Sequence, residues 1–89
     1  MNKQQRNKLN SIIKDNTSGS SELVNKINYF FIQNSEDIKL IKESASLIKK
    51  NLDHFAAVKK YLENVFTIIS DGSLNKLIKF LIDNGMEIV

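Results

Sequence analysis

A chain of 89 residues with 42% hydrophobic residues has room for one small hydrophobic core. It contains no cysteine, which excludes disulfides, thiolate metal sites and a cysteine nucleophile. The formal net charge of +3 is modest, and lysines occur in every segment, interleaved with Asp and Glu. Arg6 is the only arginine, whereas proteins that read nucleic acid rely on arginine. We therefore rank nucleic acid last among the partners considered.

Proline is absent and glycine occurs only three times, which is typical of helices joined by short turns. The apolar runs are shorter than the roughly 18 residues that a membrane span requires. The first six residues are polar and lead into no apolar signal-peptide core. We therefore expect a cytoplasmic protein without a membrane association.

The first expected helix covers residues 3–14. Its apolar stripe consists only of Leu9, Ile12 and Ile13, so we expect it to be the least stable helix. The second helix is expected to begin in the hydroxyl-rich cluster at residues 17–21. One face of this helix carries the apolar residues Leu23, Ile27, Phe30 and Phe31. The pattern breaks at Asn34-Ser35.

Ser35 is the predicted cap of the third helix, which runs to about Asn51. Its apolar stripe consists of Ile38, Ile41, Ala45 and Ile48, broadened by Leu40 and Leu47. Asp53 is the predicted cap of the fourth helix. The most regular amphipathic pattern of the chain follows, with apolar residues at Phe55, Val58, Leu62, Val65 and Ile69. We expect this helix to be the spine of the core.

Asp71-Gly72-Ser73 separates the last two expected helices, with Gly72 as a left-handed C-cap and Ser73 as the next N-cap. The fifth helix has its apolar residues at Leu74, Leu77, Ile78, Leu81 and Ile82 and is expected to end at Asn84-Gly85. Residues 86–89 are β-prone, and two alternatives stay open for them: the tail frays, or it enters a strand of an α/β domain that this chain lacks, which we favour. The sequence thus predicts an all-α fold, a compact bundle of about five helices. Residues 1–89 would form one helical domain, the N-terminal module of a longer chain.

Residues with catalytic chemistry are scarce. His54 is the only histidine, and at a helix start it is more typical of a capping or packing residue than of an acid–base group. With no second histidine and no cysteine, we predict no metal site, no catalytic residue and no cofactor. The serines of the 17–21 cluster have no neighbouring base, so we do not predict a nucleophile.

The segment 15–23 (DNTSGSSEL) places hydroxyl side chains around Gly19 at a helix N-terminus. Such an end carries free N–H groups and a partial positive charge, and can hold a phosphate. Most capped helix starts bind nothing, so this pattern alone does not identify a site.

A second segment accompanies it: residues 54–58 (HFAAV), continuing to 61–65 (YLENV). In order and spacing the two resemble the N-terminal helical region of the initiation factor 2B-like family. That family includes isomerases of methylthioribose 1-phosphate and ribose 1,5-bisphosphate. The tail at residues 81–89 is similar to the entry into the family's first strand.

This resemblance implies a helical domain followed by a larger Rossmann-like domain, which carries the isomerases' catalytic cysteine and aspartate. In those isomerases the turn helps to hold the substrate phosphate, and an arginine stands where this chain has Ser18. Only Ser18, Gly19 and Ser20 are carried over, as a phosphate-binding turn. The implied role is to help form a phosphosugar or nucleotide pocket, without catalysis by this chain alone.

Two other functions stay open. The chain could be a stand-alone module for protein–protein interaction, including homo-oligomers, with Leu40, Leu47, Ile68 and Ile78 as candidate contacts. The turn at residues 70–73 also resembles that of a helix-turn-helix motif. The helix after it offers only Asn75, Lys76 and Lys79 to nucleic acid, which is why we rank this function last.

Overall fold

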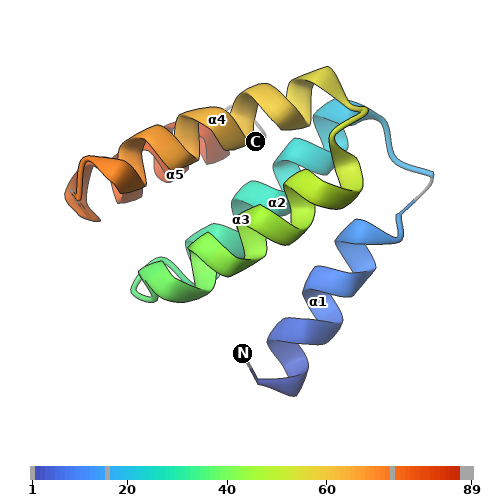
Figure 1. Cartoon of the computed structure of the whole chain (residues 1–89), viewed down its shortest axis with the longest axis horizontal. Helices are drawn as coiled ribbons and strands as arrows, with labels where there is room; N and C mark the ends of the chain where they lie inside the picture. Colours follow the sequence, from blue (N-terminus) through green and yellow to red (C-terminus); the bar gives the residue numbers. More distant parts are fainter. Residues whose placement is uncertain (1, 16, 73, 87–89) are drawn as a thin grey trace.

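The computed structural model describes residues 2–15, 17–72 and 74–86. Within these ranges the chain forms five α-helices and no strand (Figure 1). The helices are α1 (Lys3–Ile13), α2 (Ser20–Gln33), α3 (Ile38–Leu52), α4 (Ala56–Ser70) and α5 (Leu74–Met86). The predicted all-α bundle of five helices is confirmed. None of the described helices has the length and apolar character needed to cross a bilayer.

Helices α2 and α4 hold the bundle together. Helix α2 packs against α1, α4 and α5, and α4 packs against α2, α3 and α5. Helix α1 contacts α2 and α3, and lies on the side of the bundle away from α4 (Figure 1). The Cα radius of gyration is 12.0 Å, which matches the value of about 12 Å for a compact domain of this length.

The core is built from the apolar stripes of all five helices. Its fully or nearly fully buried members include Leu9, Leu23, Ile27, Phe31, Ile41, Ile48, Val58, Leu62, Val65, Leu77 and Leu81. Helix α4 contributes at every turn, as expected for the spine of the core, because its apolar residues repeat at alternating intervals of three and four. The predicted stripes are wider than the buried ones, since Leu47, Leu74 and Ile82 are exposed.

Helix α1 begins with a capping box and is tied to the far end of α2. The Asn2 side chain accepts from the Gln5 N–H at 2.8 Å, and the Gln5 side chain accepts from the Asn2 N–H at 2.9 Å. The Gln5 amide also donates to Asn34 Oδ1 at 2.8 Å, just beyond the C-terminus of α2. Helices α1 and α2 therefore form an antiparallel pair that is pinned at this end.

Two predicted helix caps are wrong. Asp37, not Ser35, caps α3, because its carboxylate accepts from the Leu40 N–H at 3.0 Å. Asp53 does not cap α4 but ends α3 in a right-handed conformation, and the Phe55 N–H then donates to the Leu52 carbonyl. The N-cap of α4 is Phe55, which has no side-chain oxygen to offer.

The turn before α5 contains the left-handed glycine that the sequence predicts, since Gly72 has φ +73°. Its predicted partner Ser73 lies outside the described residues. Helix α5 continues to Met86, past the end predicted at Asn84-Gly85. Residues 87–89 of the predicted strand entry lie outside the described residues.

Candidate functional site

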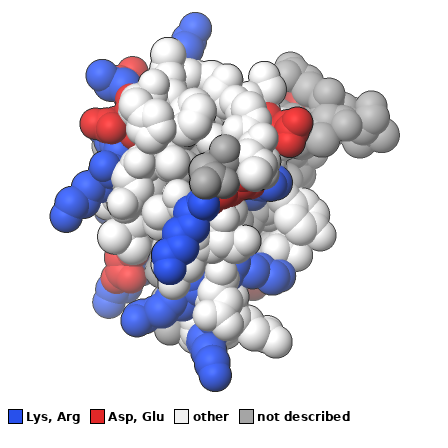
Figure 2. All heavy atoms as spheres, turned by 90° about the vertical axis from the view of Figure 1, so that its right-hand side faces the viewer, with Lys and Arg blue, Asp and Glu red and all other residues white. Residues whose placement is uncertain are grey.

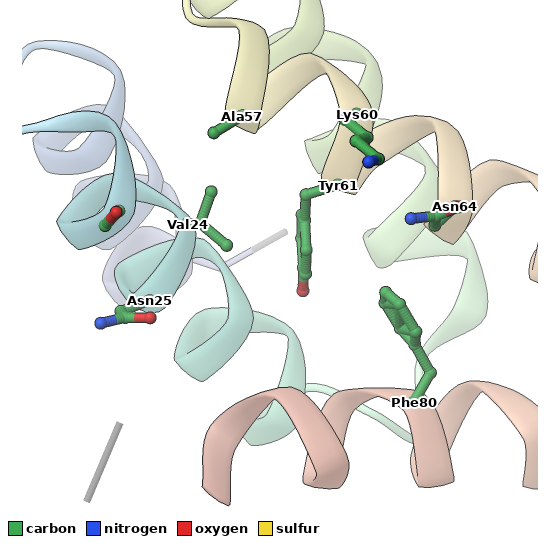
Figure 3. Close-up of a pocket in the computed structure, with 8 residues that line it drawn as sticks. Val24, Asn25, Ala57, Lys60, Tyr61, Asn64 and Phe80 are labelled. Carbon is green, nitrogen blue, oxygen red and sulfur yellow. The ribbon is translucent and has the colours of Figure 1, made fainter. Parts of the chain in front are cut away.

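A pocket of about 480 Å³ opens between α2, α4 and α5 (Figure 3). Its lining residues are Ser21, Val24, Asn25, Ala57, Lys60, Tyr61, Asn64 and Phe80. Helix periodicity brings them together: Ser21 and Asn25 are one turn apart on α2, and Lys60 and Asn64 are one turn apart on α4. The pocket thus has contributions from three helices, of which α2 is separated in sequence from the consecutive helices α4 and α5 by α3.

Tyr61 forms the floor of the pocket, and its hydroxyl is held by the buried side-chain amide of Asn28. Its hydroxyl donates to Asn28 Oδ1 at 2.6 Å, and Asn28 Nδ2 donates to the Leu81 carbonyl at 2.8 Å. The carbonyl can only accept, which fixes the amide orientation and makes the tyrosine the donor. Both side chains are almost fully buried, at 1% exposure for Asn28 and 5% for Tyr61. This chain of hydrogen bonds links α4, α2 and α5.

Aromatic rings flank Tyr61 on two sides. The Phe31 ring is stacked with it at a centroid distance of 6.3 Å, and the Phe80 ring lies tilted at 5.6 Å. Burial raises the pKa of the Tyr61 phenol far above its ordinary value of 10.0. The floor is therefore a neutral, fixed aromatic surface with its hydroxyl already paired.

The rim of the pocket is polar. Lys60 brings a positive charge, and Asn25 and Asn64 bring amides that both donate and accept. Ser21 adds a hydroxyl from the first turn of α2, where the helix dipole favours negative charge. Lys60, Asn64 and Ser21 are exposed, so a ligand reaches them from solvent. Such a rim can bind an anion and hydroxyl groups above an apolar floor.

The predicted phosphate-binding turn is occupied by a side chain of the protein itself. The Asp15 carboxylate accepts from the N–H groups of Thr17 and Ser18, both at 3.0 Å, and from both hydroxyls. Lys26 completes the arrangement by pairing with Asp15 and donating to Ser18 Oγ. The hydrogen bond from Lys26, followed by those from Ser18 and Thr17, holds the pKa of Asp15 far below its usual range.

The three residues of that turn do not line the pocket. Gly19 is the N-cap of α2 without a side-chain hydrogen bond, and Ser20 is the first helical residue. Ser18 is held by Asp15 and Lys26, so the next serine, Ser21, is the nearest residue of the cluster that reaches the rim.

His54 is also remote from the pocket lining. It is exposed in the turn between α3 and α4, with its ring 4.3 Å from that of Phe55. Its ring thus contacts its chain neighbour and none of the pocket residues.

Sequence reasoning missed Asn28, Lys60 and Asn25 as members of this region. A signal for Asn28 was present, because it lies four residues after Val24 and three before Phe31, inside the apolar face of α2. A polar residue on a buried face needs a hydrogen-bond partner, which points to a tyrosine or a carbonyl nearby.

Comparisons of the chain with protein-family models, curated proteins and solved structures found no match.

Proposed function

We propose that this chain is the N-terminal helical module of an initiation factor 2B-like protein, and that it helps to hold a phosphosugar or nucleotide. One observation carries the proposal. The pocket is lined from both segments on which the resemblance rests, with Ser21 from the first and Ala57, Tyr61 and Asn64 from the second. Lys60, which also lines the pocket, lies between the two parts of the second segment. The packing of α2 against α4 brings the two segments together, so a ligand in this pocket would contact both.

The chemistry of the pocket supports a phosphorylated ligand. Lys60 and the N-terminus of α2 favour a phosphate, while Asn25 and Asn64 suit the hydroxyls of a sugar. Tyr61 and Phe80 provide an apolar floor for the ring of the ligand. The carried-over turn Ser18-Gly19-Ser20 then has an indirect role, which is to position the start of α2.

The pocket is open and shallow, so the isolated 89 residues should bind weakly and catalyse nothing. We expect dissociation constants in roughly the millimolar range, because one charged group and a few hydrogen bonds act on a solvent-exposed anion. The suitable measurement is NMR titration of the amide signals with ribose 5-phosphate and with adenosine monophosphate. Shifts should concentrate on the first turns of α2 and the first two turns of α4.

Lys60→Gln tests the site, and Lys59→Gln is its matched control. Both lysines are exposed neighbours on α4, but only Lys60 lines the pocket. Lys60→Gln should weaken phosphate binding about tenfold, which is typical of a lost charge-assisted hydrogen bond. Equal losses in the two variants, or equal binding of unphosphorylated ribose, would contradict the proposal.

A second candidate function, as a protein interaction module, is favoured by the outer face of α5. Leu74, Ile78 and Ile82 follow one another at intervals of four residues, and the first and last are 39% and 49% exposed. Of the contacts predicted from the sequence, Leu40 is wrong because it is buried in the core, whereas Leu47 is exposed. Sedimentation at increasing concentration tests this function, and Ile82→Glu should abolish any self-association that occurs through α5.

A further inference from the structure

A groove of about 220 Å³ lies between α1 and α2 and shares no lining residue with the pocket described above. Helix α1 contributes Ser11 and Ile12 to it, and α2 contributes Tyr29 and Phe30. Ile12 and Phe30 are buried and form an apolar floor, whereas Tyr29 is 62% exposed and stands at the edge. An aromatic ring in water beside an apolar floor provides a wall against which a second ring can pack.

A side-chain bridge joins the two sides of the groove at each end. Because α1 and α2 are antiparallel, Lys8 faces Gln33 at one end, and its ammonium donates to Gln33 Oε1 at 3.3 Å. At the other end Lys26 pairs with Asp15, which follows α1. Both lysines line the groove. Seven residues of helix rise about 10 Å, so the two bridges bound a short groove and not an open channel.

The two ends of the groove differ in charge. Lys26 is neutralised by Asp15, whose carboxylate also accepts hydrogen bonds from the turn that follows it. Lys8 is bonded to a neutral amide, and among the described residues it has no acidic partner. None of the described residues that line the groove is acidic. The groove is therefore apolar along its floor and positive at the Lys8 end.

The surroundings of the groove add to this positive charge. The first fourteen residues contain four of the thirteen basic residues and none of the ten acidic ones. Lys3, Arg6 and Lys14 lie on another flank of α1 and do not line the groove. Lys and Arg side chains nevertheless predominate over Asp and Glu on the side of the molecule where α1 lies (Figure 2). An anion that approaches α1 therefore meets a positive potential before it reaches Lys8.

We propose that this groove binds a small aromatic carboxylate, with its ring between Ile12 and Tyr29 and its carboxylate at Lys8. The Lys8 ammonium donates to the carboxylate in a charge-assisted hydrogen bond. Because the Gln33 oxygen faces Lys8, the amide nitrogen of Gln33 can donate to the same anion.

The size of the groove agrees with such a ligand. One helical turn, about 6 Å, separates Lys8 from Ile12, a span that a carboxylate and a phenyl ring joined by two methylene groups can cover. A cavity of about 150 Å³ accommodates benzene in another protein, so a groove of about 220 Å³ has room for the ring and its linker.

Other ligands suit the groove less well. A peptide helix meets the two bridges after about 10 Å, which is less than two helical turns. A phosphosugar finds few partners for its hydroxyls on a floor made of Ile12 and Phe30. The proposal is thus independent of the phosphate-binding function proposed for the other pocket.

The test is NMR titration of the whole chain with 3-phenylpropionate, propionate and 3-phenylpropan-1-ol. Propionate lacks the ring, and the alcohol lacks the charge. We expect 3-phenylpropionate to shift the amide signals of Ser11, Tyr29 and Phe30, with a dissociation constant in roughly the millimolar range. The two partial ligands should bind at least about fivefold more weakly. Absence of these shifts, or equal binding of the alcohol, would overturn the proposal. Tighter binding of the peptide acetyl-Glu-Phe-Glu-amide would assign the groove to a protein partner and overturn it as well.

Lys8→Gln tests the charge, and Lys3→Gln is its matched control. Both lysines are exposed on α1, but only Lys8 lines the groove. Lys8→Gln should weaken the binding of 3-phenylpropionate about fivefold, as expected for one exposed ion pair. Lys3→Gln should change it less than about twofold, because its charge acts only from a distance. Comparable losses in the two variants would refute the placement of the carboxylate.

Tyr29→Ser tests the aromatic wall, and Tyr29→Phe is the control that keeps the ring. Because Tyr29 is exposed, neither change should unfold the protein. Tyr29→Ser should weaken the binding of 3-phenylpropionate about fivefold and leave that of propionate unchanged, since only the phenyl ring packs against Tyr29. Equal affinities of the two variants for 3-phenylpropionate would contradict the placement of its ring.

Discussion

The hydroxyl of Tyr61 lies 2.6 Å from Oδ1 of Asn28, and the two side chains meet in the core between α4 and α2. Both side chains are almost fully buried, so each depends on the other to satisfy its polar atoms. The same amide reaches the Leu81 carbonyl on α5. A polar pair therefore sets the relative position of the three helices that enclose the pocket.

Tyr61→Phe should destabilise the protein by about 1–2 kcal/mol, because it leaves the Asn28 oxygen buried without a donor. Urea denaturation followed by circular dichroism measures this change. Tyr29→Phe is the matched control, since the Tyr29 side chain is largely exposed and its hydroxyl should contribute less than about 0.5 kcal/mol. Similar losses of stability in the two variants would show that the buried hydrogen bond of Tyr61 stabilises the fold no more than the exposed hydroxyl of Tyr29 does.

The coupling between the pair can be measured separately. With Asn28→Ala as the second change, a double-mutant cycle should give an interaction energy of about 0.5–2 kcal/mol. An interaction energy near zero would mean that the hydroxyl and the amide act independently in the folded state.

Alkaline pH should reveal the burial of Tyr61. Because its pKa is higher in the folded than in the unfolded protein, the unfolded state loses the phenolic proton first. The stabilisation is complete below the ordinary value of 10.0 and decreases as the pH rises above it. The free energy of unfolding should thus fall more steeply above about pH 10 in the natural chain than in Tyr61→Phe. Parallel pH profiles would contradict a buried phenol.

Gly72→Ala should cost about 1 kcal/mol, because an alanine at φ +73° brings its Cβ close to the following carbonyl oxygen. The cost is local to the backbone, since no atom outside the glycine and its two chain neighbours lies within 4 Å of an added Cβ at this position. Gly19→Ala is the control, with a φ of −74° and equally open surroundings. Alanine is the poorer N-cap, but it also lowers the conformational entropy of the unfolded chain, so the net change in stability should stay below about 0.5 kcal/mol. Thermal or urea denaturation of both variants measures the two losses of stability. A larger loss in Gly19→Ala than in Gly72→Ala would refute this interpretation.

Asp15 should make the start of α2 sensitive to acid. The pKa of Asp15 is lower in the folded than in the unfolded protein, so its contribution to the free energy of unfolding is complete above the ordinary pKa of 3.8. This contribution is lost as the pH falls from 3.8 through the lower pKa that Asp15 has in the folded protein. Asp15→Asn should therefore be less stable than the natural chain at neutral pH, and the difference should shrink in strong acid. A difference that stays constant from neutral to acidic pH would exclude a role for the charge.

The helices were predictable because each one carries its own apolar repeat. Val58, Leu62 and Val65 lie on one face of α4 for reasons that are local to the sequence. Helix starts were less predictable, since several residues in each turn can serve as caps. Both Ser35 and Asp37 are good caps, and only the turn formed by residues 34–37 decides between them.

The pocket was not predictable because it depends on how helices pack. Lys60 and Asn25 are ordinary polar residues on their own helices, and they become a site only when α4 crosses α2. Asn28 is different, because its position inside the apolar face of α2 marks it as buried. The sequence could have predicted that Asn28 has a partner, but not that the partner is Tyr61, 33 residues further along the chain.

The carboxylate of Asp15 is a tethered competitor for any dissolved anion at the start of α2. Because it belongs to the same short loop as Thr17 and Ser18, its effective concentration at their N–H groups is roughly millimolar or higher. A phosphate at a lower concentration does not displace it from those two donors. We therefore expect an incoming phosphorylated molecule to be directed one turn onward, to Ser21 and Lys60 at the rim of the pocket.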